Sequence, residues 1–80
     1  MTKDEIKNVI IRQILEIAPE IEEDEIEADE NIQRSLEIDS FDFLRILTAM
    51  NEELGVDVPE SDYAKVESVE SMAEYFLQHL

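Results

Sequence analysis

Apolar residues recur at helical spacing near the start of this chain and lie on one face of a predicted helix. They are Ile6, Val9, Ile10, Ile14 and Ile17. Thr2 and Glu5 have the spacing of a capping box, so we expect the helix to begin near Thr2. Pro19 ends it, because the residue before a proline avoids the helical region. Ile11 and Leu15 widen the apolar face, which predicts burial of this helix on more than one side.

A second amphipathic stretch predicts a helix from Ser40 to Leu54, ended by Gly55 as a C-terminal stop signal. Its apolar face contains Phe43, Ile46, Leu47, Met50 and Leu54. A third helix is expected to begin near Ser68, a suitable N-cap, with Glu70 in its first turn. Its apolar face contains Val69, Met72, Ala73, Phe76, Leu77 and Leu80. A short further helix is expected over residues 61–66.

Residues 18–38 form a long acidic connection in which aliphatic side chains occur singly. They are Ile21, Ile26, Ile32, Leu36 and Ile38. Because structureless loops of this length are uncommon in small domains, we expect these side chains to pin the connection to the core. A short helical turn is expected around residues 24–27. The whole pattern predicts an all-α fold, a small four-helix bundle of three main helices plus one short helix, as one domain over residues 1–80.

The charge of the chain restricts its classes of partner. The sequence holds 22 acidic and 6 basic residues, which give a formal net charge of −16. Nucleic acids and anionic membrane surfaces repel such a chain, whereas basic patches on other proteins attract it. No apolar run reaches membrane-spanning length, and the first residues have no signal region. We therefore expect a cytoplasmic protein, a monomer, without stable membrane insertion.

Catalytic and metal-binding patterns are absent from the sequence. Cysteine does not occur, so the chain has no thiolate chemistry of its own. His79 is the single histidine and has no base partner, and no carboxylate pair suggests acid/base catalysis. The acidic stretch 22–30 lacks the glycine of a calcium-binding loop. The sequence predicts a non-enzymatic protein without a metal site.

Ser40 is the candidate functional residue, because it stands where free N–H groups at the start of a helix favour anions. One hypothesis is that Asp39 or Ser40 only caps the helix. The other is that the Ser40 hydroxyl is modified, for which the helix N-terminus would stabilise an attached phosphodiester. Phe41 points away from the Phe43 face, so it is either exposed or packed on the preceding loop.

The segment Leu36-Glu37-Ile38-Asp39-Ser40-Phe41-Asp42-Phe43-Leu44 resembles the attachment motif of acyl carrier proteins, roughly Asp-Leu-Gly-x-Asp-Ser-Leu. The similarity extends over nearly the whole chain, through Glu-Glu-Leu-Gly at 52–55 and Val-Pro at 58–59. The resemblance implies that Ser40 bears 4′-phosphopantetheine, installed by a phosphopantetheinyl transferase that uses coenzyme A and Mg²⁺. It also implies that Asp39 assists this step and that the thiol of the arm holds acyl groups as thioesters.

The resemblance further implies that helix 40–54 presents the arm to acyl-loading and acyl-using enzymes with basic docking patches. The residues expected to bind partners are Phe41, Asp42, Arg45, Thr48 and Glu52. The residues expected to line an interior that shelters an acyl chain are Ile10, Ile14, Phe43, Leu47, Met50 and Phe76.

The chain departs from the family pattern at four positions. Glu37 stands in place of glycine, Ser35 in place of aspartate, and Phe41 in place of leucine. Arg45 stands where primary fatty-acid carriers have an acidic residue, and its charge would weaken docking on a basic patch. This suggests a specialised carrier of a fatty-acid, lipid or polyketide-like pathway. The alternative is that Arg45 only forms an intrahelical pair, with Asp42 or with neighbours on the Glu52 side.

Two other hypotheses remain open at this point. An aminoacyl or peptidyl carrier would share the bundle and the serine. An unmodified acidic helical adaptor that docks on basic protein surfaces would explain the charge, but not the placement of Asp39, Ser40 and Phe41 at the helix start.

Overall fold

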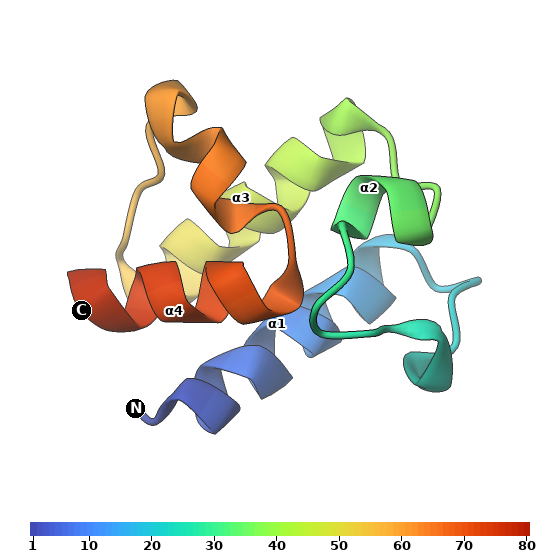
Figure 1. Cartoon of the computed structure of the whole chain (residues 1–80), viewed down its shortest axis with the longest axis horizontal. Coiled ribbons are helices and arrows are strands. Elements are labelled where there is room, and N and C mark those ends of the chain that lie inside the picture. The colour runs from blue at the N-terminus through green and yellow to red at the C-terminus, as the bar shows by residue number, and fades with distance from the viewer.

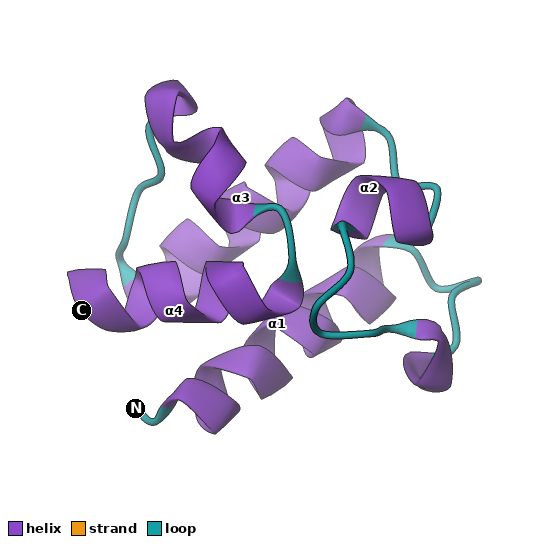
Figure 2. Cartoon of the chain, in the orientation of Figure 1, coloured by secondary structure: helices purple, strands orange, loops and turns teal.

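A computed structural model describes all 80 residues and contains helices and loops but no strands (Figure 2). The α-helices are α1 (Lys3–Ile17), α2 (Ile32–Ser35), α3 (Ser40–Leu54) and α4 (Val69–His79). Two 3₁₀ helices, η1 (Glu23–Glu25) and η2 (Glu60–Val66), lie in the connections. The predicted all-α bundle is confirmed: α1, α3 and α4 are its three main helices, and η2 is the short helix expected over residues 61–66.

The predicted helix ends are confirmed by their hydrogen bonds. The Thr2 N–H donates to Glu5 Oε1 over 2.7 Å, and the Glu5 N–H donates to Thr2 Oγ1 over 3.2 Å, which completes the capping box of α1. Ser68 caps α4 by accepting from the Ser71 N–H over 3.0 Å. At the end of α3, Gly55 adopts the left-handed conformation with φ of 72°.

The core forms where α1 packs against both α3 and α4 (Figure 1). In that view both termini lie on the same side of the molecule. With the exception of Tyr75, the buried apolar side chains of these helices belong to the predicted apolar faces. They are Ile6, Ile10 and Ile14 of α1, Phe43, Ile46, Leu47 and Met50 of α3, and Val69, Met72, Ala73, Tyr75 and Phe76 of α4.

The edges of the predicted apolar faces are less buried than expected. Ile11 and Leu15 are only half-buried, so the prediction that α1 is buried on a second side is wrong. The reason is that α3 and α4 cover one side of α1 and leave Ile11 and Leu15 at the border with solvent. Leu77 of α4 and Leu80, which follows that helix, are exposed.

The long connection between α1 and α3 is pinned to the core, as predicted. Ile32 and Ile38 are buried, and the other aliphatic side chains of the connection pack against the core. Two backbone hydrogen bonds of 2.8 Å tie it to the start of α4, from the Ile32 N–H to the Glu67 carbonyl and from the Glu70 N–H to the Ala28 carbonyl. The single turn of α2 was not predicted, because four residues are too few to show helical periodicity.

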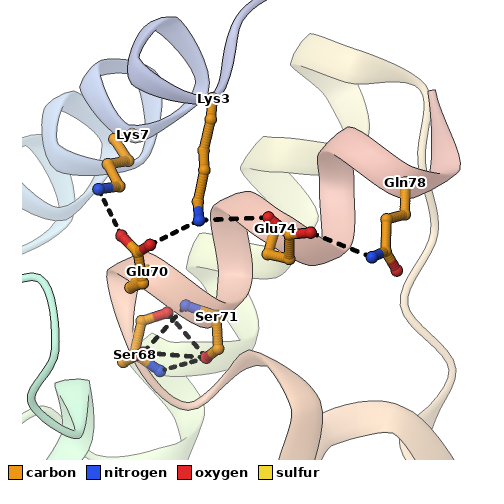
Figure 3. Close-up of polar contacts among 7 residues, drawn as sticks. All are labelled: Lys3, Lys7, Ser68, Glu70, Ser71, Glu74 and Gln78. Atoms are coloured by element: carbon orange, nitrogen blue, oxygen red, sulfur yellow. Dashed lines mark hydrogen bonds and ion pairs between the residues drawn. The ribbon is translucent and has the colours of Figure 1, made fainter.

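Ion pairs join α1 to α4 on the surface (Figure 3). Lys3 Nζ lies 2.5 Å from Glu70 Oε1 and 3.2 Å from Glu74 Oε2, and Lys7 pairs with the other oxygen of Glu70. Hydrogen bonds from Lys3 and Lys7 hold the pKa of the Glu70 carboxyl below its usual value, and those to Glu70 and Glu74 raise the pKa of Lys3. With Arg12–Glu53, Arg45–Asp42 and Lys65–Asp62, five of the six basic side chains are in ion pairs.

The turn between α2 and α3 brings the chain to Ser40. Glu37 has a φ of 54°, the left-handed conformation that glycine adopts most easily. The Ile38 N–H donates to the Gln33 carbonyl over 3.0 Å, which is the 6→1 hydrogen bond of a Schellman motif at the end of α2. Glu37 therefore occupies, with some backbone strain, the position where the resemblance leads one to expect glycine.

The short helix η2 is attached to α4 through Asp62. The Tyr75 hydroxyl donates to Asp62 Oδ2 over 2.7 Å, and Lys65 Nζ lies 3.3 Å from the other oxygen. The Tyr75 side chain, 6% exposed, also stacks on His79 with ring centroids 4.1 Å apart. The hydrogen bond from Tyr75, followed by that from Lys65, lowers the pKa of Asp62, and the same bond to Asp62 raises the pKa of Tyr75.

The strain at Glu37 predicts that Glu37→Gly stabilises the fold by about 1 kcal/mol, since a left-handed non-glycine residue costs at least that much. Urea unfolding monitored by circular dichroism measures the change. Glu37→Ala is the matched control, because it removes the carboxylate and keeps the Cβ. A gain of the same size in Glu37→Ala would show that charge, not backbone conformation, is responsible.

The Asp62–Tyr75 hydrogen bond predicts a pH-dependent contribution to stability. Because the folded pKa of Asp62 lies below its ordinary value of 3.8, its contribution is present above that value and is lost as pH falls through the lowered pKa. We expect Tyr75→Phe to lower the free energy of unfolding near about pH 6, and the difference from the parent protein to shrink toward about pH 2. Acid also reduces the charge repulsion among the many carboxylates, but it does so equally in both proteins. This effect therefore cancels in the difference between their free energies of unfolding. A difference that stays constant or grows in acid would contradict this assignment.

Candidate functional site

Ser40 is the first residue of α3, and its side chain is exposed. The cap of the helix is Asp39, whose Oδ1 accepts from the Asp42 N–H over 2.8 Å. The Asp39 carbonyl accepts the next bond, from the Phe43 N–H, over 3.0 Å. Of the two residues considered as caps, Asp39 performs this role. The Ser40 hydroxyl therefore points to solvent without a structural task in the cap.

The start of α3 suits a phosphate ester on Ser40. The N–H groups of Ser40 and Phe41 make no hydrogen bond within the protein, so they are available as donors. They stand at the positive end of a helix of 15 residues, which favours an attached anion. An exposed hydroxyl, two free donors and the helix dipole meet at one point, and together they fit the phosphodiester of a 4′-phosphopantetheine arm.

Phe41 and Leu44 form an exposed apolar surface next to Ser40. Phe41 is 72% exposed and Leu44 is 41% exposed. Phe41 does not pack on the preceding loop, which settles the alternative left open by the sequence. Arg45, Thr48 and Glu52 are exposed as well, and at 100° per residue they share the face of Phe41. Asp42 is half-buried at the edge of this face.

Arg45 pairs with Asp42 within α3, where Nη1 and Oδ1 lie 3.2 Å apart. This is the intrahelical pair considered from the sequence. Pairs of this kind on an exposed helix contribute only tenths of a kcal/mol. More than half of the Arg45 side chain is exposed, so the pair leaves its guanidinium accessible beside Phe41.

A depression of about 420 Å³ opens beside Ser40 between α3 and η2. Ser40 lines it together with the apolar side chains of Phe43, Leu44, Tyr63 and Ala64. The polar side chains at its border are Gln33, Glu60 and Glu67. Sequence reasoning missed the lining residues of α2 and η2, because only tertiary packing brings them to Ser40.

The six residues expected to line an acyl-sheltering interior, Ile10, Ile14, Phe43, Leu47, Met50 and Phe76, are all buried. They form part of one continuous core. Phe43 is the member of this set that also lines the depression beside Ser40. The structure thus brings one of these six residues next to Ser40 and keeps the other five in the core.

None of the helices of this chain combines the length and the apolar character needed to cross a membrane. No three His, Asp or Glu side chains are grouped so that they could hold a metal ion.

Comparison with known proteins identifies the family. The model of the phosphopantetheine attachment site family matches residues 9–76. The acyl carrier protein of Lactobacillus johnsonii is 34% identical over 79 residues, which cover 99% of this chain and 98% of that protein. The acyl carrier protein of Rubrobacter xylanophilus is 26% identical over 73 residues (88% of this chain, 90% of the relative). The acyl carrier protein of Campylobacter lari is 28% identical over 72 residues, which cover 90% of this chain and 87% of that protein.

These matches span nearly the whole bundle, including the α2–α3 turn, the start of α3 and the depression beside it. The chain therefore belongs to the phosphopantetheine attachment site family and is an acyl carrier that bears 4′-phosphopantetheine.

Proposed function

We propose that Ser40 is the residue that bears the arm, and that this chain holds acyl groups as thioesters at the start of α3 without catalysing a reaction itself. The observation that supports this most directly is the division of labour at the helix start. Asp39 caps α3, whereas the exposed hydroxyl of Ser40 stands beside two free N–H groups. If Ser40 served only as a helix cap, its own hydroxyl would accept a backbone N–H of the first turn, whereas Asp39 makes that bond.

Attachment requires a phosphopantetheinyl transferase that uses coenzyme A and Mg²⁺. Ser40 Oγ forms the new P–O bond, adenosine 3′,5′-bisphosphate leaves, and the hydroxyl proton passes to a base of the transferase. Asp39 uses Oδ1 in the cap, and its exposed carboxylate supports this step from the neighbouring position. The arm supplies a terminal thiol, which this cysteine-free chain does not have.

The face of α3 that includes Phe41, Arg45, Thr48 and Glu52, with Asp42 at its edge, is the proposed docking surface. Its partners are the transferase and the enzymes that load and use the acyl group, through basic patches that meet the acidic chain. Arg45 adds a positive charge to this surface and selects partners with a suitable opposite group. We assign the chain to a specialised fatty-acid, lipid or polyketide-like pathway, as a cytoplasmic monomer.

An acyl cargo is preferred over an aminoacyl or peptidyl cargo, because the curated relatives are acyl carrier proteins. The hypothesis of an unmodified adaptor does not account for a chain that bears phosphopantetheine.

Replacing Ser40 tests the attachment site. We expect Ser40→Ala to show no mass increase after incubation with coenzyme A, Mg²⁺ and a broad-specificity phosphopantetheinyl transferase, because the only proposed acceptor oxygen is gone. Its circular dichroism should match that of the parent protein, since Asp39 still caps α3. Ser35→Ala is the control, because it removes another exposed serine, the one at the end of α2. This variant should be modified like the parent protein. An adduct on Ser40→Ala would refute the assignment.

Reversing the charge at Arg45 tests the docking surface. We expect Arg45→Glu to bind a basic transferase about two- to fivefold more tightly at low salt, since one exposed charge contributes at most about 1 kcal/mol. Arg12→Glu is the matched control, because Arg12 is equally exposed and also paired with a carboxylate, but lies on α1. Equal effects of both substitutions, measured by titration calorimetry, would mean that only net charge matters and would remove Arg45 from the docking surface.

A further inference from the structure

A second depression follows the first one along the groove between α3 and η2. It also measures about 420 Å³, and its lining includes Leu44, Leu47, Thr48, Val58 and Tyr63. Leu44 and Tyr63 line both depressions, whereas Ser40 lines only the first. The two side chains, one from each wall of the groove, therefore form the boundary between the depression at the attachment position and the one beyond it.

We propose that Tyr63 is a specificity-determining residue that sets how long an acyl chain this carrier can enclose. Together with Leu44, Tyr63 confines the acyl chain to the first depression and keeps it out of the second depression, which Leu47 and Val58 line. The proposal rests on the proposed attachment of the arm to Ser40, because that position makes the first depression the one a tethered chain can enter.

Tyr63 is suited to this role by the way it is held. Its side chain is half-buried at the edge of the core, and its hydroxyl makes no hydrogen bond within the protein. Its neighbour Asp62 instead anchors η2 to α4 through Tyr75. The position of η2 thus depends on Asp62 and on the buried Val66, and the Tyr63 ring is free to act as a wall of the groove.

The borders of the groove indicate the chemical class of the cargo. Phe43, Leu44, Ala64 and Tyr63 offer apolar surface, which favours an aliphatic chain. Glu60 and Glu67 border the first depression and Asp57 borders the second. These carboxylates repel an acyl chain that ends in a carboxylate, so the cargo that fits is a neutral aliphatic acyl group.

The test loads the full chain with saturated acyl groups of increasing length, transferred from acyl-coenzyme A by a broad-specificity phosphopantetheinyl transferase. The parent protein is compared with Tyr63→Ala, which removes the ring, and with the matched control Tyr63→Phe, which keeps it. Leu44→Ala opens the same boundary from α3 at an exposed position, so it tests the proposal even if Tyr63→Ala loosens the fold. The readouts are amide NMR shifts and the rate at which hydroxylamine cleaves the thioester.

In the parent protein and Tyr63→Phe, we expect shift changes at Phe43 and Ala64 but not at Leu47 and Val58, even with long chains. In Tyr63→Ala and Leu44→Ala, the changes should extend to Leu47 and Val58. Long chains should then slow hydroxylamine cleavage further, by up to about fourfold for each additional methylene enclosed.

Changes at Val58 with long chains on the parent protein would overturn the proposal, as would identical behaviour of both alanine variants and Tyr63→Phe. Failure to load the parent protein, seen as an unchanged intact mass, would instead overturn the attachment to Ser40 and remove the basis of this inference. The mass and the NMR readout therefore separate the two failures.

Discussion

The organisation of this protein depends on the packing of one face of α3 against α1. Phe43, Ile46, Leu47 and Met50 must be buried for the bundle to form, and helical geometry then turns the opposite face outward. That outward face holds Phe41, Arg45 and Thr48, and Ser40 stands at its start. The same hydrophobic contact that stabilises the fold thus presents Ser40 and its neighbours to solvent. A substitution that rotated or shortened α3 would change the core and the site together.

Three of the six basic side chains of this strongly acidic protein bridge two helices on the surface. Lys3 and Lys7 join α1 to α4, Arg12 joins α1 to α3, and Lys65 lies on η2 next to Asp62. The remaining acidic residues face solvent and attract basic partners. Arg45 and Lys65 instead pair within their own helices, with Asp42 on α3 and with Asp62 on η2. Of these two cations, Arg45 is the one on the exposed face of α3 that begins at Ser40.

Much of this structure could be predicted from the sequence, and the exceptions have physical causes. The capping box at Thr2, the Asp39-Ser40 pair and Gly55 are local signals, and they place α1 and α3 correctly. Helical periodicity places Phe41 away from the core face, but it is the structure that shows the side chain exposed and not packed on the preceding loop. In contrast, α2 is too short for periodicity, the left-handed conformation of Glu37 is one that its side chain disfavours, and Tyr63 and Ala64 reach Ser40 only through the packing of η2 on α4. Contacts between segments distant in sequence leave no pattern in a single chain.

We infer that the start of α3 is a preformed site for a phosphate that joins the arm to Ser40. Amide NMR spectra of the chain before and after attachment test it most directly, because the N–H groups of Ser40 and Phe41 have no partner in the unmodified protein. We expect large shifts at Ser40, Phe41 and Asp42, with the core amides of α1 and α4 nearly unchanged. Small changes at these residues with the largest ones elsewhere, or a general rearrangement of the core, would contradict it.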